Sequence, residues 1–495
     1  MKKFFKNSFN ILFFVCITYL MINILMNSKL NNIWIDLGVI LYIVFFLFLE
    51  KKISKISIKK YMFFIVFFIM IFLQMIAGYL FKVLPSWDFG TVYMEGINPS
   101  FQIQNLTYFC RFPNNMPTAY LLKIIFLVIR LFKIKDYLYV GMVINIFCID
   151  ISILMTILTV KEMLGKENAF FSLIFMAQMS VFYLIVPIFY TDTFSMPFAI
   201  SQLYIFLKFR KAENQKKKIL YSMCLSIFAF LGMNIKVTVG VCFVAIMIYE
   251  IFLNEESNLK QMIYPCISIV SLVLLIFFEM LLFKYHCEYI ERIDNERFGF
   301  YHYLMMSASM QGGYNDLECE YTASFPTKEE KKEADITRYK EKMKNFNTVK
   351  SFLALVTNKE IEMWGVGTYY IPQLLFGNKI RTGPIQKLVY GENNKLYIYF
   401  SQVQRISMIV LIWLSIFYRD KSYLNKSINT ILRLATLGFI IFFTFWEVAP
   451  RYIIHFLPIF IVLQIFGLET CEQIFSDLKN IDISKLKSLN FNKKE

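Results

Sequence analysis

Long apolar segments recur along most of the chain, and short polar or basic clusters separate them. Many of these segments hold about 18 or more apolar residues, which is the length that an α-helix needs to cross a bilayer. The first segment, 9–26, is too long for a signal peptide, and no small-residue cleavage site follows it. We interpret it as a retained helix, and the whole pattern predicts an all-α polytopic membrane protein with about twelve transmembrane helices.

Composition agrees with this class of protein. Of the 495 residues, 57% are hydrophobic and 18% are charged, whereas soluble proteins have roughly 45–50% apolar and about 25% charged residues. The net charge is +16, but the Lys and Arg residues gather at the ends of the apolar segments. The positive-inside rule and anionic lipid headgroups account for this excess. The expected partners are therefore membrane lipids and not nucleic acids.

The placement of Lys and Arg also predicts the orientation of the chain in the plasma membrane. Three lysines, Lys2, Lys3 and Lys6, precede the first span. Alternate short loops carry further basic clusters, at 51–60, 161–166, 208–218 and 419–426. The positive-inside rule places these loops and both termini in the cytoplasm.

One apolar stretch, 120–133, does not fit a span. It is about 14 residues long, shorter than a spanning helix needs, and Lys123 and Arg130 interrupt it. We expect an amphipathic helix that lies on the outer leaflet. A span at this point would turn every later basic cluster outward, against the positive-inside rule.

Three regions follow from this topology. The first is an N-terminal transmembrane region, 1–283, with a large outer loop at 84–137. The second is an extracytoplasmic segment, 284–404, with interfacial helices. There, Thr327 and Glu330 form a capping-box pattern that opens a charged helix toward Phe346. The third region, 405–495, holds the last transmembrane helices and a basic cytoplasmic tail.

This topology gathers ionisable residues on the outer face. They are Asp88, Glu95, Arg111, Asp192, Lys236, Glu447 and Arg451. Asp88 follows the third span directly, and a carboxylate at this interface is positioned to act as a general base toward a hydroxyl. Its alternative role is to cap a helix or to pair with Lys82.

The other candidates also have a structural reading beside the functional one. Asp192 fits a cap at a tight turn, and Lys236 fits a lysine whose amine reaches the interface. As functional groups, Lys236 and Thr238 would bind a phosphate. Arg451 offers a planar fork for phosphate oxygens, or pairs with Glu447 four residues earlier. Arg111 would bind a donor or acceptor, or cap a turn.

Other chemistries lack sequence support. The nine Cys residues form no CxxC motif, and the three His residues are dispersed, so we expect no zinc or His-based metal site. No P-loop, GxSxG or HExxH motif is present. We predict no cofactor, while the sequence leaves metal dependence and oligomeric state open.

Several short elements together resemble a known family. An Asp follows an early helix in the first large outer loop (Trp87-Asp88), and Arg111-Phe-Pro leads into a juxtamembrane helix. Later come Thr191-Asp192-Thr193, Lys236-Val-Thr238 and Glu447-Val-Ala-Pro-Arg451-Tyr452. In order and sidedness the chain resembles the GT-C superfamily of polyprenyl-phosphate-sugar-dependent glycosyltransferases. Protein O-mannosyltransferase-like and aminoarabinose transferase-like enzymes (glycosyltransferase family 39-like) belong to it. The chain departs from the family in two extra helices before the Asp loop, and in Phe89 after Asp88, where an acidic residue is frequent.

The resemblance implies a GT-C-like helix bundle with extracytoplasmic juxtamembrane helices, and an inverting hexosyl- or pentosyltransferase. The sugar would pass from a polyprenyl phosphate to an extracytoplasmic hydroxyl on a glycan, lipid or protein. Asp88 would be the catalytic base, and Lys236 and Arg451 would neutralise the leaving phosphate. The further substrate-binding candidates are Asp192, Thr238, Arg111, Glu447 and Tyr452. The Phe-, Lys-, Asn- and Ile-rich composition suits a low-GC bacterium, with an undecaprenyl-phosphate donor and an envelope glycopolymer acceptor.

Three alternatives remain at this point. A transporter or flippase for a lipid-linked glycan would place polar groups near the bilayer midplane, commonly with internal repeats. A polysaccharide polymerase or ligase of the O-antigen type would share the many spans and the large outer loop. A membrane scaffold without enzymatic activity is the third.

Overall fold

The computed structural model describes residues 2–28, 30–100, 102–256, 258–420 and 422–479. In these ranges every regular element is a helix, and a single isolated bridge joins Val83 to Lys379. The prediction of an all-α protein is therefore confirmed for these residues. The predicted basic tail at 480–495 lies outside the described residues.

Nine helices within the described ranges are long and apolar enough to cross a membrane. They are α1 (Lys2–Asn27), α2 (Ile33–Ile53), α3 (Lys60–Leu80), α7 (Tyr137–Leu164), α12 (Gln215–Ile235), α14 (Ile263–His286), α22 (Lys395–Leu414, extended by η5, Ser415–Phe417), α23 (Tyr423–Phe445) and α24 (Leu457–Lys479, preceded by η6, Pro450–Phe456).

The sequence places three more spans where the structure has shorter helices. These are α8 (Lys166–Ala177) with α9 (Val181–Leu184), α11 (Met196–Lys211), and α13 (Gly240–Ile248) with the π-helical turn η3 (Tyr249–Leu253). Each of these helices is shorter than the 20 or so residues of a regular span. The total of twelve spans therefore stays a prediction.

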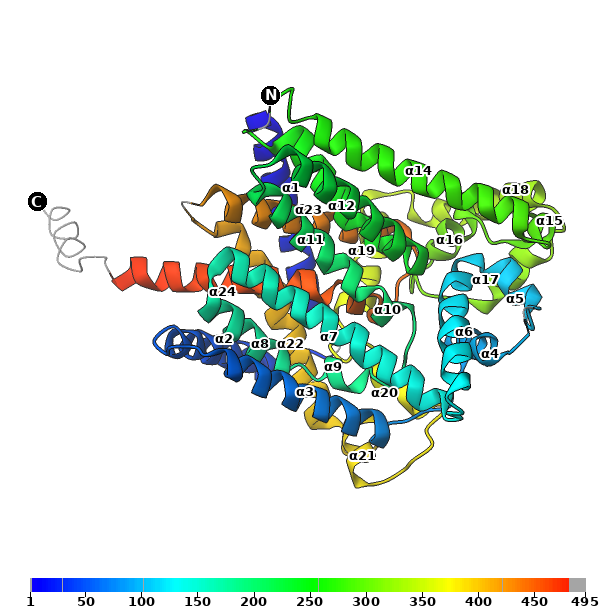
Figure 1. Cartoon of the computed structure of the whole chain (residues 1–495), viewed down its shortest axis with the longest axis horizontal. Helices are drawn as coiled ribbons and strands as arrows, with labels where there is room; N and C mark the ends of the chain where they lie inside the picture. Colours follow the sequence, from blue (N-terminus) through cyan, green and yellow to red (C-terminus); the bar gives the residue numbers. More distant parts are fainter. Residues whose placement is uncertain (1, 29, 101, 257, 421, 480–495) are drawn as a thin grey trace, which may run out of the picture.

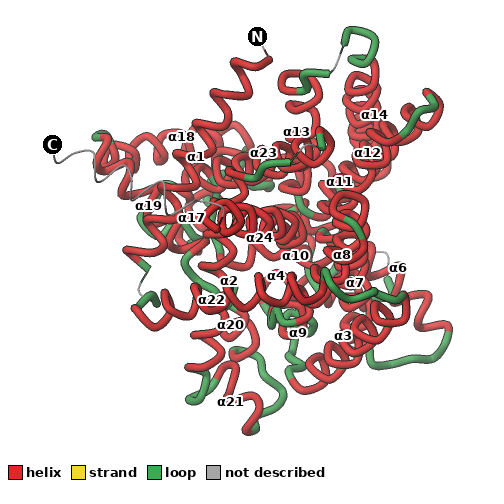
Figure 2. Tube along the Cα trace, turned by 90° about the vertical axis from the view of Figure 1, so that its left-hand side faces the viewer, coloured by secondary structure: helices red, strands yellow, loops and turns green. Residues whose placement is uncertain are grey.

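Helix α24 forms the centre of the bundle. Its side chains are almost all buried, and α7, α11, α22 and α23 pack around it (Figure 2). The approach of α22 is close, because a Cβ added at Gly467 of α24 would collide with the carbonyl oxygen of Leu411. In contrast, α14 packs mainly against α12 and leaves most of its apolar side chains exposed, as a helix that faces lipid does.

Short helices cover one end of the bundle, at the right in Figure 1. The first group is α4 (Trp87–Ile97), α5 (Leu106–Arg111), η1 (Pro113–Asn115) and α6 (Met116–Leu131). The second group is α15 (Ile290–Glu296), α16 (Phe300–Ser307), α17 (Asp316–Ala323), α18 (Lys328–Met343) and η4 (Lys344–Phe346). Helix α5 packs against α15, so the two groups meet.

Three further helices complete the segment before α22. They are α19 (Val349–Trp364), which packs beside α1, and α20 (Ile371–Phe376) and α21 (Pro384–Tyr390). Helix α6 is not among the candidate spans, and in Figure 1 it runs across the direction of the long helices. The stretch 120–133 is thus not a candidate span, and its position on the outer leaflet stays a prediction.

Two local expectations can be compared with the structure. Thr327 caps α18, and its hydroxyl accepts a hydrogen bond from the backbone N–H of Glu330 at 3.3 Å, so the predicted charged helix is confirmed.

Helix α22, however, begins at Lys395 and not near 405. Its polar side chains are buried against neighbouring segments, as when Gln402 donates to Asn31 Oδ1 at 2.9 Å. Because of these polar residues, the sequence pattern assigned the residues before 405 to the extracytoplasmic segment.

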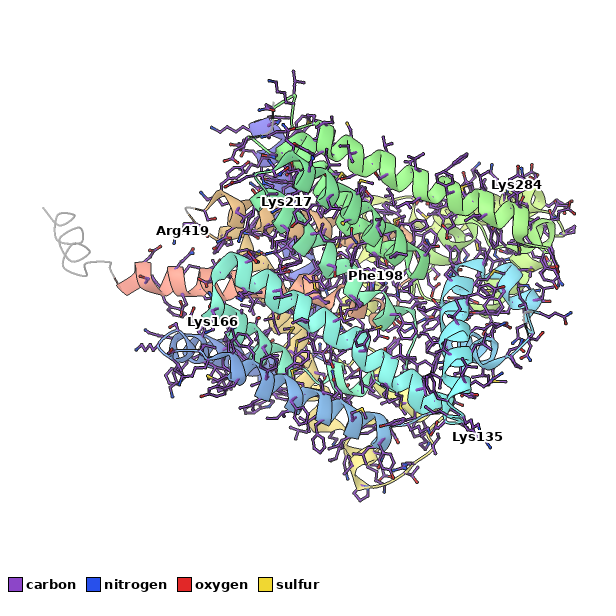
Figure 3. All side chains as sticks on the ribbon, viewed as in Figure 1. Lys135, Lys166, Phe198, Lys217, Lys284 and Arg419 are labelled. Atoms are coloured by element: carbon purple, nitrogen blue, oxygen red, sulfur yellow. The ribbon has the colours of Figure 1, made fainter. Side chains whose placement is uncertain are left out.

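The two ends of the bundle differ in the loops that they carry. Lys166, Lys217 and Arg419, from three of the predicted cytoplasmic clusters, lie at the left-hand end (Figure 3). Lys135 and Lys284 lie at the opposite end, which the short helices cover. The loops that the charge rule assigns to one side thus occur at one end.

Candidate functional site

A cavity of ≈ 1240 Å³ lies where the short helices meet the bundle. Its bundle side is formed by the end of α12, by η2 (Val237–Val239), by the end of α23 and by η6, and its other walls come from α4 and the α15–α18 segment. Six of the eight predicted site residues line it: Asp88, Lys236, Thr238, Glu447, Arg451 and Tyr452. Asp192 lies directly behind this lining, and Arg111 lies outside it.

Asp88 faces the cavity from the first turn of α4. Its Oδ1 accepts a hydrogen bond from the Tyr108 hydroxyl at 2.8 Å. The alternative reading as a partner for Lys82 is wrong, because Lys82 pairs with Asp136 at 2.9 Å. Nor is Asp88 the cap of its helix, since Ser86 occupies that position. Neither structural reading of Asp88 therefore holds.

A chain of hydrogen bonds continues from Asp88 into the bundle. Asn115 Nδ2 donates to the Tyr108 oxygen at 2.7 Å, and the Tyr190 hydroxyl donates to Asn115 Oδ1 at 2.9 Å. Burial, with the Asp88 charge adding to it, raises the pKa of the Tyr190 hydroxyl. Burial likewise raises the pKa of Tyr108, so both phenols stay protonated and act as donors. The chain holds one carboxylate oxygen of Asp88 in place.

Trp87 precedes Asp88 in an uncommon backbone conformation. Its φ is +46°, in the left-handed region that bulky residues seldom adopt. The Arg451 guanidinium lies 4.7 Å from the Trp87 ring centroid, and the Tyr190 ring stands perpendicular to it at 5.0 Å. A cation above an aromatic face is favourable, so these contacts help to offset the strain and hold Arg451 against Trp87, the residue that precedes Asp88.

Asp192, in α10 (Thr191–Phe194), joins the two cations of the site. Its Oδ2 accepts from Arg451 at 2.7 Å, and its Oδ1 pairs with the Lys236 ammonium. Burial by itself raises the pKa of this carboxyl, but Lys236 and Arg451 overcome that effect and lower it to about 2. The three groups together carry a net charge of +1. Asp192 is therefore an ion-pair partner and not a helix cap.

Tyr452 and Glu447 complete this side of the cavity. The Tyr452 ring lies 4.4 Å from Lys236 Nζ and 4.9 Å from the Arg451 guanidinium. Its hydroxyl donates to Glu447 at 2.7 Å. The alternative pairing of Arg451 with Glu447 is wrong, because within the described chain Arg451 forms its ion pair with Asp192. Burial raises the pKa of Glu447, which favours its neutral form.

The remaining predicted residues are placed differently. The Thr238 hydroxyl is within 2.8 Å of His455 Nε2, so part of its hydrogen-bonding capacity is already used. The backbone carbonyl of Arg111 accepts from Phe298 at the contact between α5 and the outer segment. Glu95 is buried and pairs with Lys123, which makes it a structural link between α4 and α6.

Several residues that line the cavity or support Asp88 were not predicted as site residues. Tyr108 lies in the predicted outer loop, Asn115 in the stretch that leads into the predicted juxtamembrane helix, and Tyr190 at the predicted end of a span. The outer wall adds Arg297, Lys331 and other lysines, as well as aromatic rings. In the described ranges, no group of three or more His, Cys, Asp or Glu side chains is arranged to hold a metal ion.

One comparison with known proteins finds a match. The model of a family described as "Conserved hypothetical integral membrane protein" matches residues 1–472. The chain belongs to this family. Neither a curated protein nor a solved structure matches it. Membership supports an integral membrane protein that contacts lipids, and the site itself has to indicate the chemistry.

Proposed function

We propose that this protein is an integral-membrane glycosyltransferase of the GT-C type. It transfers a sugar from a polyprenyl-phosphate donor to a hydroxyl of a cell-envelope glycan, lipid or protein. One observation carries the proposal: Asp88 faces the same cavity as the cations Lys236 and Arg451, at the ends of candidate membrane spans. This arrangement combines a base with a phosphate site at the place where a lipid-linked substrate is accessible.

In the proposed reaction, Asp88 takes the proton of the acceptor hydroxyl as its oxygen attacks the anomeric carbon of the sugar. The bond from that carbon to the phosphate oxygen breaks, and its electron pair stays on the phosphate. The products are a glycoside with inverted configuration and a polyprenyl phosphate. One base suffices, because attack opposite the leaving group needs no covalent intermediate.

Lys236 and Arg451 act on the leaving phosphate, where negative charge increases in the transition state. Asp192 fixes both cations by accepting from each, and their net charge of +1 remains available to an anion. Guanidinium groups bind phosphate oxygens in a fork geometry. The positions of Lys236 after α12 and of Arg451 before α24 suit a phosphate whose prenyl chain lies in the bilayer.

The proposed active site is extracytoplasmic. The basic clusters at the opposite end of the bundle (Figure 3) are of the kind that the positive-inside rule assigns to the cytoplasm. Aromatic residues of the cavity favour a sugar substrate. Tyr303 and Trp446 line the wall and stack on each other at 4.7 Å, and such rings offer apolar faces for a pyranose.

A transfer assay tests the proposal. Full-length protein in lipid nanodiscs would be incubated with a panel of polyprenyl-phosphate sugars and an envelope-glycan fraction. Release of polyprenyl phosphate would be measured by mass spectrometry. We expect release that depends on both substrates, and Asp88→Asn to reduce it at least about 100-fold, as loss of a general base does.

Asp136→Asn is the matched control. Asp136 lies in the same outer loop, is exposed and pairs with Lys82, and Asn retains its capping of α7. This control should keep wild-type activity. Equal activity of Asp88→Asn and wild type would reject Asp88 as the base, and absence of release with every donor would reject the glycosyltransferase proposal.

A further inference from the structure

The cavity has a second group of cations, on the side opposite the membrane. Four residues of the outer segment, Arg297, Lys328, Lys331 and Lys332, line it there. We refer to these four residues as the α18 wall. Arg297 and Lys328 share one carboxylate, Asp294, at 2.9 and 3.2 Å. Asp316 and Asp335 also line this region.

Lys331 is the residue of the α18 wall that most strongly indicates an anion site, because it is buried and, in the part of the chain that the structure describes, has no ion-pair partner. Its exposed fraction is 5%, and its ammonium donates to the backbone carbonyl of Asn295 at 2.6 Å. Within the described residues no carboxylate forms an ion pair with it. A buried ammonium has three donors, and leaving its charge without a counter-ion is costly.

The acidic groups around Lys331 only partly balance its charge. Glu296 is engaged by Arg292 at 2.6 Å. Asp335 accepts from the Thr322 hydroxyl at 2.6 Å, and burial raises the pKa of this carboxyl to about 6. Burial lowers the pKa of Lys331, and the nearby Arg111 charge adds to that effect. Lys332, the next residue of α18, adds a further cation. Its Nζ lies 5.7 Å from the centroid of the Tyr301 ring.

This wall and the Lys236–Arg451 pair occupy different parts of one large cavity. A volume of ≈ 1240 Å³ exceeds the roughly 300–1,000 Å³ of ordinary ligand pockets, so two substrates fit. Lys236 and Arg451 lie at the ends of spans, where a lipid-anchored phosphate is held. The α18 wall belongs to the outer segment at the end of the bundle in Figure 1, and therefore faces a substrate that arrives from water.

We propose that the α18 wall binds a phosphate or carboxylate group of the acceptor, so that the acceptor is an anionic glycan or polyol-phosphate polymer. This inference rests on the proposed function and names its acceptor class. Lys331 supplies a desolvated, charge-assisted hydrogen bond, which is stronger than one at the surface. Lys332 supplies a more exposed charge that also guides approach.

Binding of a defined oligomer tests the inference. Full-length protein in zwitterionic nanodiscs would be titrated with a short glycerol-phosphate oligomer, and with a neutral oligosaccharide of equal length. We expect tighter binding of the anionic oligomer, with an affinity that falls as salt rises. Lys331→Gln should weaken it about tenfold and Lys332→Gln about threefold. Gln at 331 can still donate to Asn295.

Lys340→Gln is the control, because Lys340 is an exposed residue of the same helix that does not line the cavity. It should leave the affinity unchanged. Equal binding by wild type, Lys331→Gln and Lys332→Gln would overturn the inference, as would equal affinity for the neutral oligosaccharide. The titration would be repeated in nanodiscs that contain anionic lipid. If this lipid displaces the oligomer from wild type but not from Lys331→Gln, the α18 wall binds lipid headgroups.

The two proposals fail in different ways. Oligomer binding that depends on Lys331, together with full transfer activity of Asp88→Asn, would reject the catalytic role and leave the anion site. If Asp88→Asn loses transfer while Lys331→Gln and Lys332→Gln bind the oligomer as wild type does, the anion site is rejected and the catalytic role of Asp88 stands.

Discussion

Replacement of Asp192 by Asn separates the electrostatics of the site from its shape. The change keeps the size of the side chain but removes the charge that joins Lys236 and Arg451. The pKa of Asp192 is about 2 in the folded protein, against an ordinary value of 3.8. A difference of this size corresponds to about 2 kcal/mol of stability at neutral pH. We expect Asp192→Asn to lower the free energy of unfolding by about that amount or more, because two cations remain buried without their partner.

The lowered pKa of Asp192 also determines how its contribution to stability changes with pH. A carboxyl whose pKa is lower in the folded state stabilises the protein above its unfolded pKa, and this contribution is lost as the pH falls through the folded value. The difference in thermal midpoint between wild type and Asp192→Asn should therefore be full at pH 7. It should shrink as the pH falls from about 4 to about 2.

Thermal unfolding followed by tryptophan fluorescence in detergent would measure both effects. Asp136→Asn serves as the control, since its exposed pair with Lys82 should contribute less than about 1 kcal/mol. Equal midpoints of Asp192→Asn and wild type at pH 7 would refute the ion-pair argument. A difference that stays constant down to pH 2 would refute its electrostatic origin.

Three further predictions concern the site, the packing and the topology. Tyr108→Phe removes the donor to Asp88 and should reduce transfer about tenfold with little change in KM; wild-type kcat would contradict this. Gly467→Ala should destabilise the α22–α24 contact by about 1–3 kcal/mol, because the new Cβ meets the Leu411 carbonyl; an unchanged thermal midpoint would contradict that packing. In intact cells, a membrane-impermeant thiol reagent should label Lys284→Cys but not Lys217→Cys, which lie at opposite ends in Figure 3, and the reverse pattern would invert the topology.

Much of the site's composition follows from the sequence because lipid excludes charge. An ionisable residue next to a long apolar segment has to lie at the interface, and the positive-inside rule sorts these ends into two groups. This reasoning selected Asp88, Lys236 and Arg451, which line one cavity. The cap at Thr327 was predictable for another reason, since its partner is only three residues away.

Pairings across the fold were not predictable in the same way. The alternative pairing of Glu447 with Arg451 assumed helical spacing, but Pro450 begins the 3-10 helix η6, and the preceding residues are not helical. The hydrogen bonds of Tyr108 and Asn115 depend on how α5 and η1 pack, and no periodic pattern encodes that. The start of α22 was misplaced because buried polar residues such as Gln402 lower the hydropathy of its first turns, so the sequence assigned them to the extracytoplasmic segment.

The most direct test of the central claim compares envelope glycans in cells. A deletion strain would be complemented with wild type, Asp88→Asn or Asp136→Asn at equal membrane levels, and released glycans would be analysed by mass spectrometry. The account predicts that wild type and Asp136→Asn restore one sugar substituent that Asp88→Asn leaves missing. Restoration of the same glycans by Asp88→Asn would contradict it.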